Sequence, residues 1–202
     1  MRAALHAEWT KWRTTAGPGW LLLAGAAAVA GLGVPVNRLA GLYLGQAAPA
    51  ILAVLTISTE YSTGLIRATL TATPRRSVVL AAKATILALT VAAAGGGALL
   101  ALRITPRAYA GSVLYLVLVA LLSLGIGVLA RDSAAAIGTV LGLLYLPPLF
   151  AFSLGDPHWQ RLVDRAAPMS AAAGSWGSLA VLAGWAGGAL LAGALVFRRR
   201  DA

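Results

Sequence analysis

The sequence predicts an all-α, polytopic membrane protein of six transmembrane helices with an N-terminal interfacial amphipathic helix, all in one transmembrane domain over residues 1–202. Hydrophobic residues make up 59% of the chain and charged residues only 11%, and the mean hydropathy is +0.83. A soluble domain needs a polar shell that this composition cannot supply. Because a spanning helix takes about 20 apolar residues, the chain has room for roughly six spans and no soluble catalytic domain.

Residues 1–16 are predicted to form the interfacial helix. Trp9 and Trp12 lie on one helical face, and Lys11 and Arg13 supply charge at the membrane surface. Tryptophan favours the level of the lipid headgroups, so this face is expected to rest against the membrane. The long charged region and the wholly hydrophobic remainder argue against a cleaved signal peptide.

Six apolar runs follow the Gly-Pro-Gly tract that is expected to end the interfacial helix. The predicted spans cover about residues 20–36, 39–58, 78–102, 110–130, 134–154 and 174–197. Residues 59–77 are predicted to form a cytoplasmic loop, and residues 155–173 an extracellular segment with a short helix. Pro147 and Pro148 should kink or break the fifth span, because missing amides and ring clashes interrupt a helix. Such a break could act as a gate, and a static kink fits the pattern equally well.

The basic residues predict the orientation of the spans. If the N-terminus lies inside and the spans alternate, the interior holds 11 basic residues and the exterior holds 5. The interior set is Arg2, Lys11, Arg13, Arg67, Arg75, Arg76, Lys83, Arg131, Arg198, Arg199 and Arg200, and the exterior set is Arg38, Arg103, Arg107, Arg161 and Arg165. This bias predicts that both termini are cytoplasmic.

Several kinds of chemistry are not expected in this chain. The acids Glu8, Glu60, Asp132, Asp156, Asp164 and Asp201 all fall outside the predicted apolar cores, which argues against proton-coupled or ion-coupled transport. The two histidines, His6 and His158, fall on opposite sides of the membrane and cannot share a metal. Neither lysine belongs to a phosphate-binding loop, so no catalytic residue, bound cofactor or metal is expected. The basic residues lack interleaved aromatics, so nucleic acid is not an expected partner.

Four polar residues inside the spans are open to two interpretations. Gln46, Ser123, Thr139 and Tyr145 fit helix packing or bonding to the backbone as well as they fit a substrate path.

Residues 60–76 form the longest polar stretch inside the chain and are the candidate docking element for a cytoplasmic partner. Tyr61, Leu65 and Leu70 would lie along one side of a short helix that ends before Pro74. An ordinary positively charged loop is the alternative.

Two stretches carry a resemblance to a known family. Residues 5–14 read Leu-His-Ala-Glu-Trp-Thr-Lys-Trp-Arg-Thr, and residues 60–70 read Glu-Tyr-Ser-Thr-Gly-Leu-Ile-Arg-Ala-Thr-Leu, followed by Pro-Arg-Arg at 74–76 and by Lys83. With this Glu-Tyr-x-x-Gly-x-x-Arg pattern placed after the second span, the chain resembles the ABC-2 type permease family, particularly its six-span actinobacterial members.

The resemblance implies a membrane-spanning permease subunit of an ABC transporter in a bacterial plasma membrane, most members being exporters. A separate cytoplasmic ATPase would bind ATP and Mg²⁺, and this chain would pair with itself or with a similar permease. The implied coupling helix, which docks the ATPase, uses Glu60, Tyr61, Gly64, Arg67, Leu70, Arg75 and Arg76. A non-transporting assembly or sensor subunit with the same dock is the alternative.

Glu60 is also expected to pair with Lys11 or Arg13 of the interfacial helix and so to tie the loop to the membrane surface. Reversing the charge at Glu60 should then weaken docking, and reversing Lys11 as well should restore it.

Overall fold

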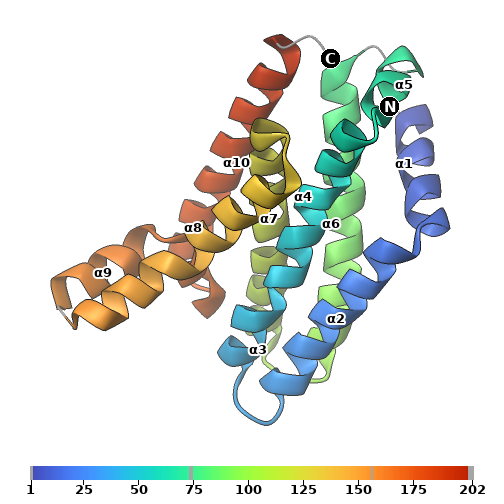
Figure 1. The fold of residues 1–202 in the computed structure, drawn as a ribbon. Coiled ribbons are helices and arrows are strands. Elements are labelled where there is room, and N and C mark those ends of the chain that lie inside the picture. Colours follow the sequence, from blue (N-terminus) through green and yellow to red (C-terminus); the bar gives the residue numbers. More distant parts are fainter. Residues whose placement is uncertain (1, 73–74, 156, 200–202) are drawn as a thin grey trace.

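A computed structural model describes residues 2–72, 75–155 and 157–199 of the chain, and these residues form an all-α bundle (Figure 1). In chain order the helices are α1 (Arg2–Thr14), α2 (Ala16–Gly33), α3 (Arg38–Gly45), α4 (Ala47–Ser62), α5 (Leu65–Ala72), α6 (Arg76–Leu100), α7 (Pro106–Ala130), α8 (Ser133–Leu154), α9 (Pro157–Ala166), the 3-10 helix η1 (Pro168–Ala173) and α10 (Trp176–Arg199). The predicted fold class is confirmed.

The chain is a multi-pass membrane protein by the length and hydropathy of its helices. Among the described residues, 5 helices are long and apolar enough to cross a membrane, or up to 6 if a bent N-terminal pair counts as one span. The 5 are Arg38–Ser62, Arg76–Leu100, Pro106–Ala130, Ser133–Ser153 and Trp176–Phe197. They correspond to the second to sixth predicted spans, and the bent pair of α1 and α2 contains the first.

The N-terminal break lies earlier than the sequence predicted. The Gly-Pro-Gly tract belongs to the first turn of α2, and Thr15, which has an extended backbone, separates α2 from α1. Pro18 fits there because the first amides of a helix have no partner inside the helix, so its missing N–H costs nothing. The two helices are bent by 74° from one another.

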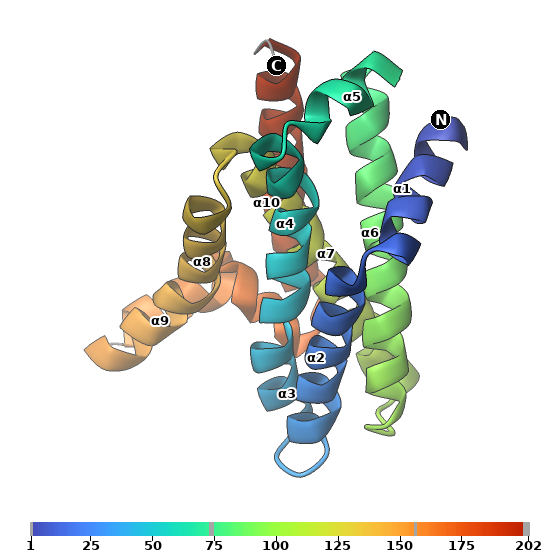
Figure 2. The ribbon, with the colours of Figure 1, turned by 45° about the vertical axis from the view of Figure 1, so that its right-hand side comes forward.

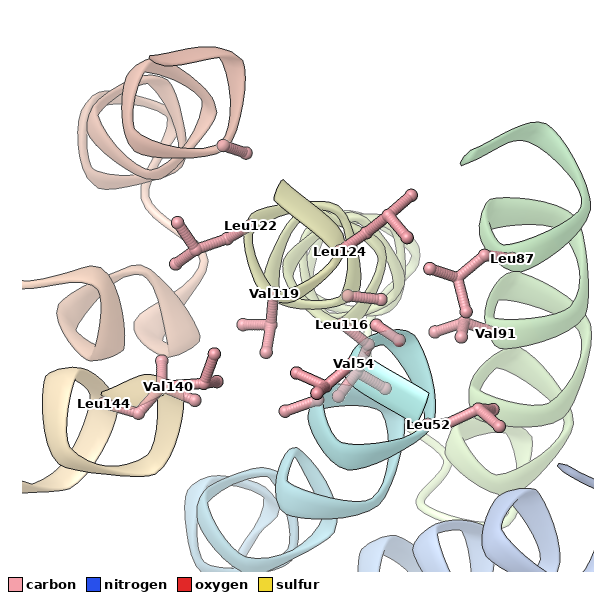
Figure 3. Close-up of a cluster of buried hydrophobic side chains, with 14 of the residues drawn as sticks. Leu52, Val54, Leu87, Val91, Leu116, Val119, Leu122, Leu124, Val140 and Leu144 are labelled. Carbon is pink, nitrogen blue, oxygen red and sulfur yellow. The ribbon is translucent and has the colours of Figure 1, made fainter. Parts of the chain in front are cut away.

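Helix α7 is the centre of the bundle and packs against α4, α6, α8 and α10. Figure 3 shows its side chains Leu116, Val119, Leu122 and Leu124 among those of Leu52, Val54, Leu87, Val91, Val140 and Leu144 from three neighbouring helices. The α7–α10 contact depends on Gly125, where an added Cβ would lie 2.6 Å from the backbone carbon of Ala189. Small residues bring membrane helices close together in this way.

The second span is divided at Gln46, which separates α3 from α4. Pro49 has no amide to donate to the carbonyl of Gly45, four residues earlier, so the regular hydrogen-bond ladder is interrupted here. In contrast, α8 is continuous through Pro147 and Pro148, so of the predicted kink or break, the break is wrong. The second half of α8 turns away from the bundle toward α9 (Figure 2), and a gating role for the two prolines stays a prediction.

One end of the bundle gathers the start of α1, all of α5 and the last turns of α10, and the turn between α2 and α3 lies at the opposite end (Figure 1). Gly64, with φ of +71°, makes the turn from α4 into α5, a backbone conformation that glycine adopts without steric cost. The short helix predicted within residues 155–173 is α9.

Candidate functional site

Four charged side chains meet in a buried cluster beside α5. The Nζ of Lys11 lies 3.0 Å from Glu8 Oε1 and 2.6 Å from Glu60 Oε1. The Nζ of Lys83 lies 3.0 Å from Glu8 Oε2 and 2.7 Å from Glu60 Oε1. Each lysine therefore bridges both carboxylates, and the four charges sum to zero. We call these four residues the ion cluster.

The ion cluster ties together helices that are far apart in the sequence. Glu8 and Lys11 stand one turn apart on α1, Glu60 lies near the end of α4, and Lys83 lies in the second turn of α6. Lys83 also donates to the carbonyl of Thr56 at 3.3 Å, and Lys11 donates to the hydroxyl of Thr69 on α5 at 3.5 Å. These contacts fix α1, α4, α5 and α6 to one another.

Burial makes the ion cluster sensitive to the loss of any single charge. Glu8 is 3% exposed, Glu60 5% and Lys83 1%, so these groups have lost most of their water. Removing one partner of a buried pair leaves an uncompensated charge, which typically costs about 3–5 kcal/mol. Lys11 differs because its side chain keeps 41% of its exposure.

The pKa of Lys11 depends on both its partial burial and its two carboxylate partners. Partial burial disfavours its charged form, but the hydrogen bonds and charges of Glu60 and Glu8 outweigh that effect and raise the pKa above its ordinary value. Lys11 therefore stays protonated through the physiological pH range.

One sequence prediction about these residues needs correction, and another is confirmed. Glu8 and Glu60 are not outside the packed bundle: α1 packs its Ala4–Glu8 side against α6, and α4 continues to Ser62, which brings both carboxylates inside. The predicted pairing of Glu60 with Lys11 is confirmed, and Arg13 is exposed.

Sequence reasoning noted Lys83 but missed its contacts with Glu8 and Glu60, because it was counted as a surface charge at the start of a span. Its position inside an apolar run was the available signal. Lys83 also contacts Glu60. A charge reversal at Lys11 alone would therefore not restore the docking that is lost when the charge of Glu60 is reversed.

The predicted docking residues divide between two locations. Tyr61 belongs to α4 together with Glu60, and Gly64 forms the turn. Arg67 and Leu70 lie on α5, but their side chains are outside the part that the structure describes, as is all of Pro74. Arg75 is exposed, and Arg76 begins α6.

Two neighbouring apolar residues of α5 differ in burial. Ile66 is buried at 4% exposure, whereas Leu65 is 55% exposed. Leu65 also lines the cavity that borders the ion cluster. Among the described side chains of α5, Leu65, Ala68 and Thr71 are the exposed part of the predicted docking element.

A second group of contacts joins the helix ends at this side of the bundle. The Arg131 guanidinium lies 4.9 Å from the ring centre of Tyr61, and Tyr61 meets Phe197 edge to face at 6.4 Å. The Arg76 guanidinium lies over the ring of Phe197 and donates to its carbonyl at 2.6 Å. Cation–π contacts of this kind add stability, and here they connect α4, α6, α7 and α10.

A cavity of about 550 Å³ opens beside the ion cluster. Its charged wall is Glu8, Lys11, Glu60 and Lys83, and its apolar wall includes Trp12, Pro18, Leu21, Leu52 and Leu55. The cavity is thus lined mainly by apolar side chains with a few charged groups, the general composition of ligand pockets.

A neutral polar network lies further along the same span. The buried Tyr115 hydroxyl donates to Gln46 Oε1, Gln46 Nε2 donates to the carbonyl of Tyr43 at 3.1 Å, and the Tyr145 hydroxyl donates to the same carbonyl. Ser123 and Thr139 bond to the backbone of their own helices, at 2.7 and 2.8 Å. All four polar residues that were open to two interpretations thus have hydrogen-bond partners within the bundle.

Comparisons with known proteins do not identify a family. Neither the scan against protein-family models nor the search of curated proteins finds a match for this chain. The structure itself shows a multi-pass membrane protein with a buried ion cluster next to a short helix.

Proposed function

We propose that this chain is the membrane-spanning permease subunit of an ABC exporter and that a separate cytoplasmic ATPase docks on α5. The observation that supports the proposal most strongly is the position of α5: a short helix between two spans, with an exposed leucine that borders the same cavity as the ion cluster. Glu8, Lys11, Glu60 and Lys83, which make this cluster, all belong to the stretches that carry the resemblance to ABC-2 type permeases.

The contacts suggest how force would travel. A push on α5 reaches α4 through the Gly64 turn and reaches α1 through the bond between Thr69 and Lys11. Because Lys83 holds both carboxylates, α6 follows. Helices α1, α4 and α6 would then move together against α7, α8 and α10, the kind of rigid-body step that opens a path across a membrane. This step would require the contacts of Tyr61 with Arg131 and of Arg76 with Phe197 to open.

The ATPase subunit would bind ATP and Mg²⁺ and perform the hydrolysis. The α5 end would face the cytoplasm of a bacterial cell, and two permease chains, identical or similar, would each receive one ATPase.

The docking proposal is tested with two matched leucine substitutions. Leu65→Asp changes the exposed leucine of α5, and Leu100→Asp changes a leucine that is 67% exposed at the far end of α6. The chain is purified in mild detergent from its own cells, and co-purifying ATPase is identified by peptide sequence and by ATP hydrolysis. Loss of the ATPase with Leu65→Asp and its retention with Leu100→Asp supports the proposal, whereas no ATPase with the unaltered chain contradicts it.

A further inference from the structure

The side chain of Phe197 contacts both of the spans that flank α5. Phe197 lies near the end of α10 and is 3% exposed. Tyr61, in the last turn of α4, meets the Phe197 ring edge to face, with the ring centres 6.4 Å apart. Arg76, the first residue of α6, places its guanidinium 5.7 Å from the centre of the same ring. One side chain of α10 therefore touches α4 and α6 at the ends between which α5 lies (Figure 1).

These contacts attach α10 to helices on which it otherwise packs little. Among the described residues, α10 packs mainly along α7, where Gly125 lets the two helices approach closely. Its packing on α6 is much smaller. At the α5 end, the Arg76 guanidinium also donates to the backbone carbonyl of Phe197 at 2.6 Å. The two ring contacts and this hydrogen bond are therefore the main link between α10 and the spans beside α5.

The contacts around the Phe197 ring are of a kind that opens more easily than the ion cluster. Ring pairs and cation–π contacts are individually weak. Arg76 is only half-buried, so its charge can reach water when the contact opens, whereas a break in the ion cluster leaves a buried charge. Arg131 lies over the ring of Tyr61, and its buried Nε has no acceptor among the described residues. Such a donor destabilises the arrangement that buries it.

We propose that Phe197 is a releasable latch at the α5 end of the bundle. While Tyr61 and Arg76 hold its ring, the last turns of α10 stay against α4 and α6. When the two ring contacts break, the end of α10 and the start of α6 separate as intact helices, which gives the chain a second, open arrangement. The latch is a property of the chain by itself and does not need the proposed ATPase partner.

The test measures both ends of the α6–α10 pair in the purified chain, in nanodiscs and without any ATPase. The chain has no cysteine, so spin labels can be attached at introduced cysteines. The inner pair is Ala81 on α6 with Leu195 on α10, and the outer pair is Leu100 on α6 with Ala180 on α10. All four positions are exposed. Pulsed electron resonance then gives the distribution of distances for each pair.

Phe197→Leu removes both ring contacts and keeps the backbone carbonyl that Arg76 uses. We expect the ratio of a longer to a shorter inner distance to rise by about tenfold, the effect of losing two ring contacts of ordinary strength. The outer distances should stay the same. Leu182→Ala is the control, because Leu182 is also buried in α10, at 0% exposure, and makes none of the latch contacts. It should leave both distributions unchanged.

Four results would overturn the latch. Inner distances that Phe197→Leu leaves unchanged show that the ring contacts do not hold the helices together. A broad spread of inner distances without a second distinct one shows that the end of α10 frays and does not move as a helix. A shift of the outer pair as well, or an equal shift with Leu182→Ala, shows a general loosening of the bundle.

Discussion

The ion cluster at the end of α4 and the neutral network at Gln46 both provide partners for buried polar groups, but with different kinds of side chain. Both bury polar atoms in an apolar bundle, and they lie on one span, roughly 20 Å apart at the rise of an α-helix. Near the end of the bundle the chain uses four full charges, whereas further inside it uses an amide, a backbone carbonyl and two tyrosine hydroxyls. Charge is least costly near the membrane surface, where water and headgroups are close.

The difference has a consequence for stability and for movement. A neutral hydrogen bond that breaks leaves a polar group, but an ion pair that breaks in a buried place leaves a full charge. The ion cluster should therefore hold α1, α4 and α6 together more firmly than the neutral network holds α3, α7 and α8. Three substitutions test this ranking, from the largest expected effect to the smallest.

Lys83→Met should have the largest effect. Lys83 is 1% exposed and contacts both carboxylates, so its loss leaves Glu8 and Glu60 buried with Lys11 alone. We expect the free energy of unfolding in detergent to fall by about 3–5 kcal/mol. Denaturant unfolding followed by circular dichroism measures the change. An unchanged stability would contradict the buried arrangement of the cluster.

Gln46→Leu should have an intermediate effect, because it leaves the buried hydroxyl of Tyr115 without its acceptor. The expected loss is about 1–3 kcal/mol. The double variant Gln46→Leu with Tyr115→Phe should recover part of it, since neither partner then lacks a bond. A double-mutant cycle measures the coupling, and strictly additive losses would count against the hydrogen bond.

Lys11→Met should have the smallest effect of the three. The side chain of Lys11 keeps 41% of its exposure, so solvent screens its contacts, and Lys83 still holds both carboxylates. We expect a loss of up to about 1 kcal/mol. The same unfolding assay checks it, and a loss as large as that of Lys83→Met would show that the two lysines are equivalent.

The sequence was informative where apolar runs define helices and uninformative where distant helices meet. Length and hydropathy located the second to sixth spans, and the glycine at 64 fits the turn that precedes α5. The burial of Glu8 was not predictable, because it depends on α1 packing against α6. Gln46 stood out as a polar residue in a span, but its partner Tyr115 lies on another helix. Lys83 was misplaced because a lysine near the end of a span usually reaches water.

The central claim is that α5, tied by the ion cluster to α1, α4 and α6, receives force from an ATPase and moves these helices as one body. The chain has no cysteine, so spin labels can be attached at single introduced cysteines in the complex with the ATPase. Ala68 on α5, Ala81 on α6 and Ala134 on α8 are exposed positions, and pulsed electron resonance measures the distances between them with and without a non-hydrolysable ATP analogue.

The claim predicts that the distance from Ala68 to Ala81 stays constant when the analogue binds, while the distance from Ala68 to Ala134 changes. A change between Ala68 and Ala81 with none between Ala68 and Ala134 would contradict it.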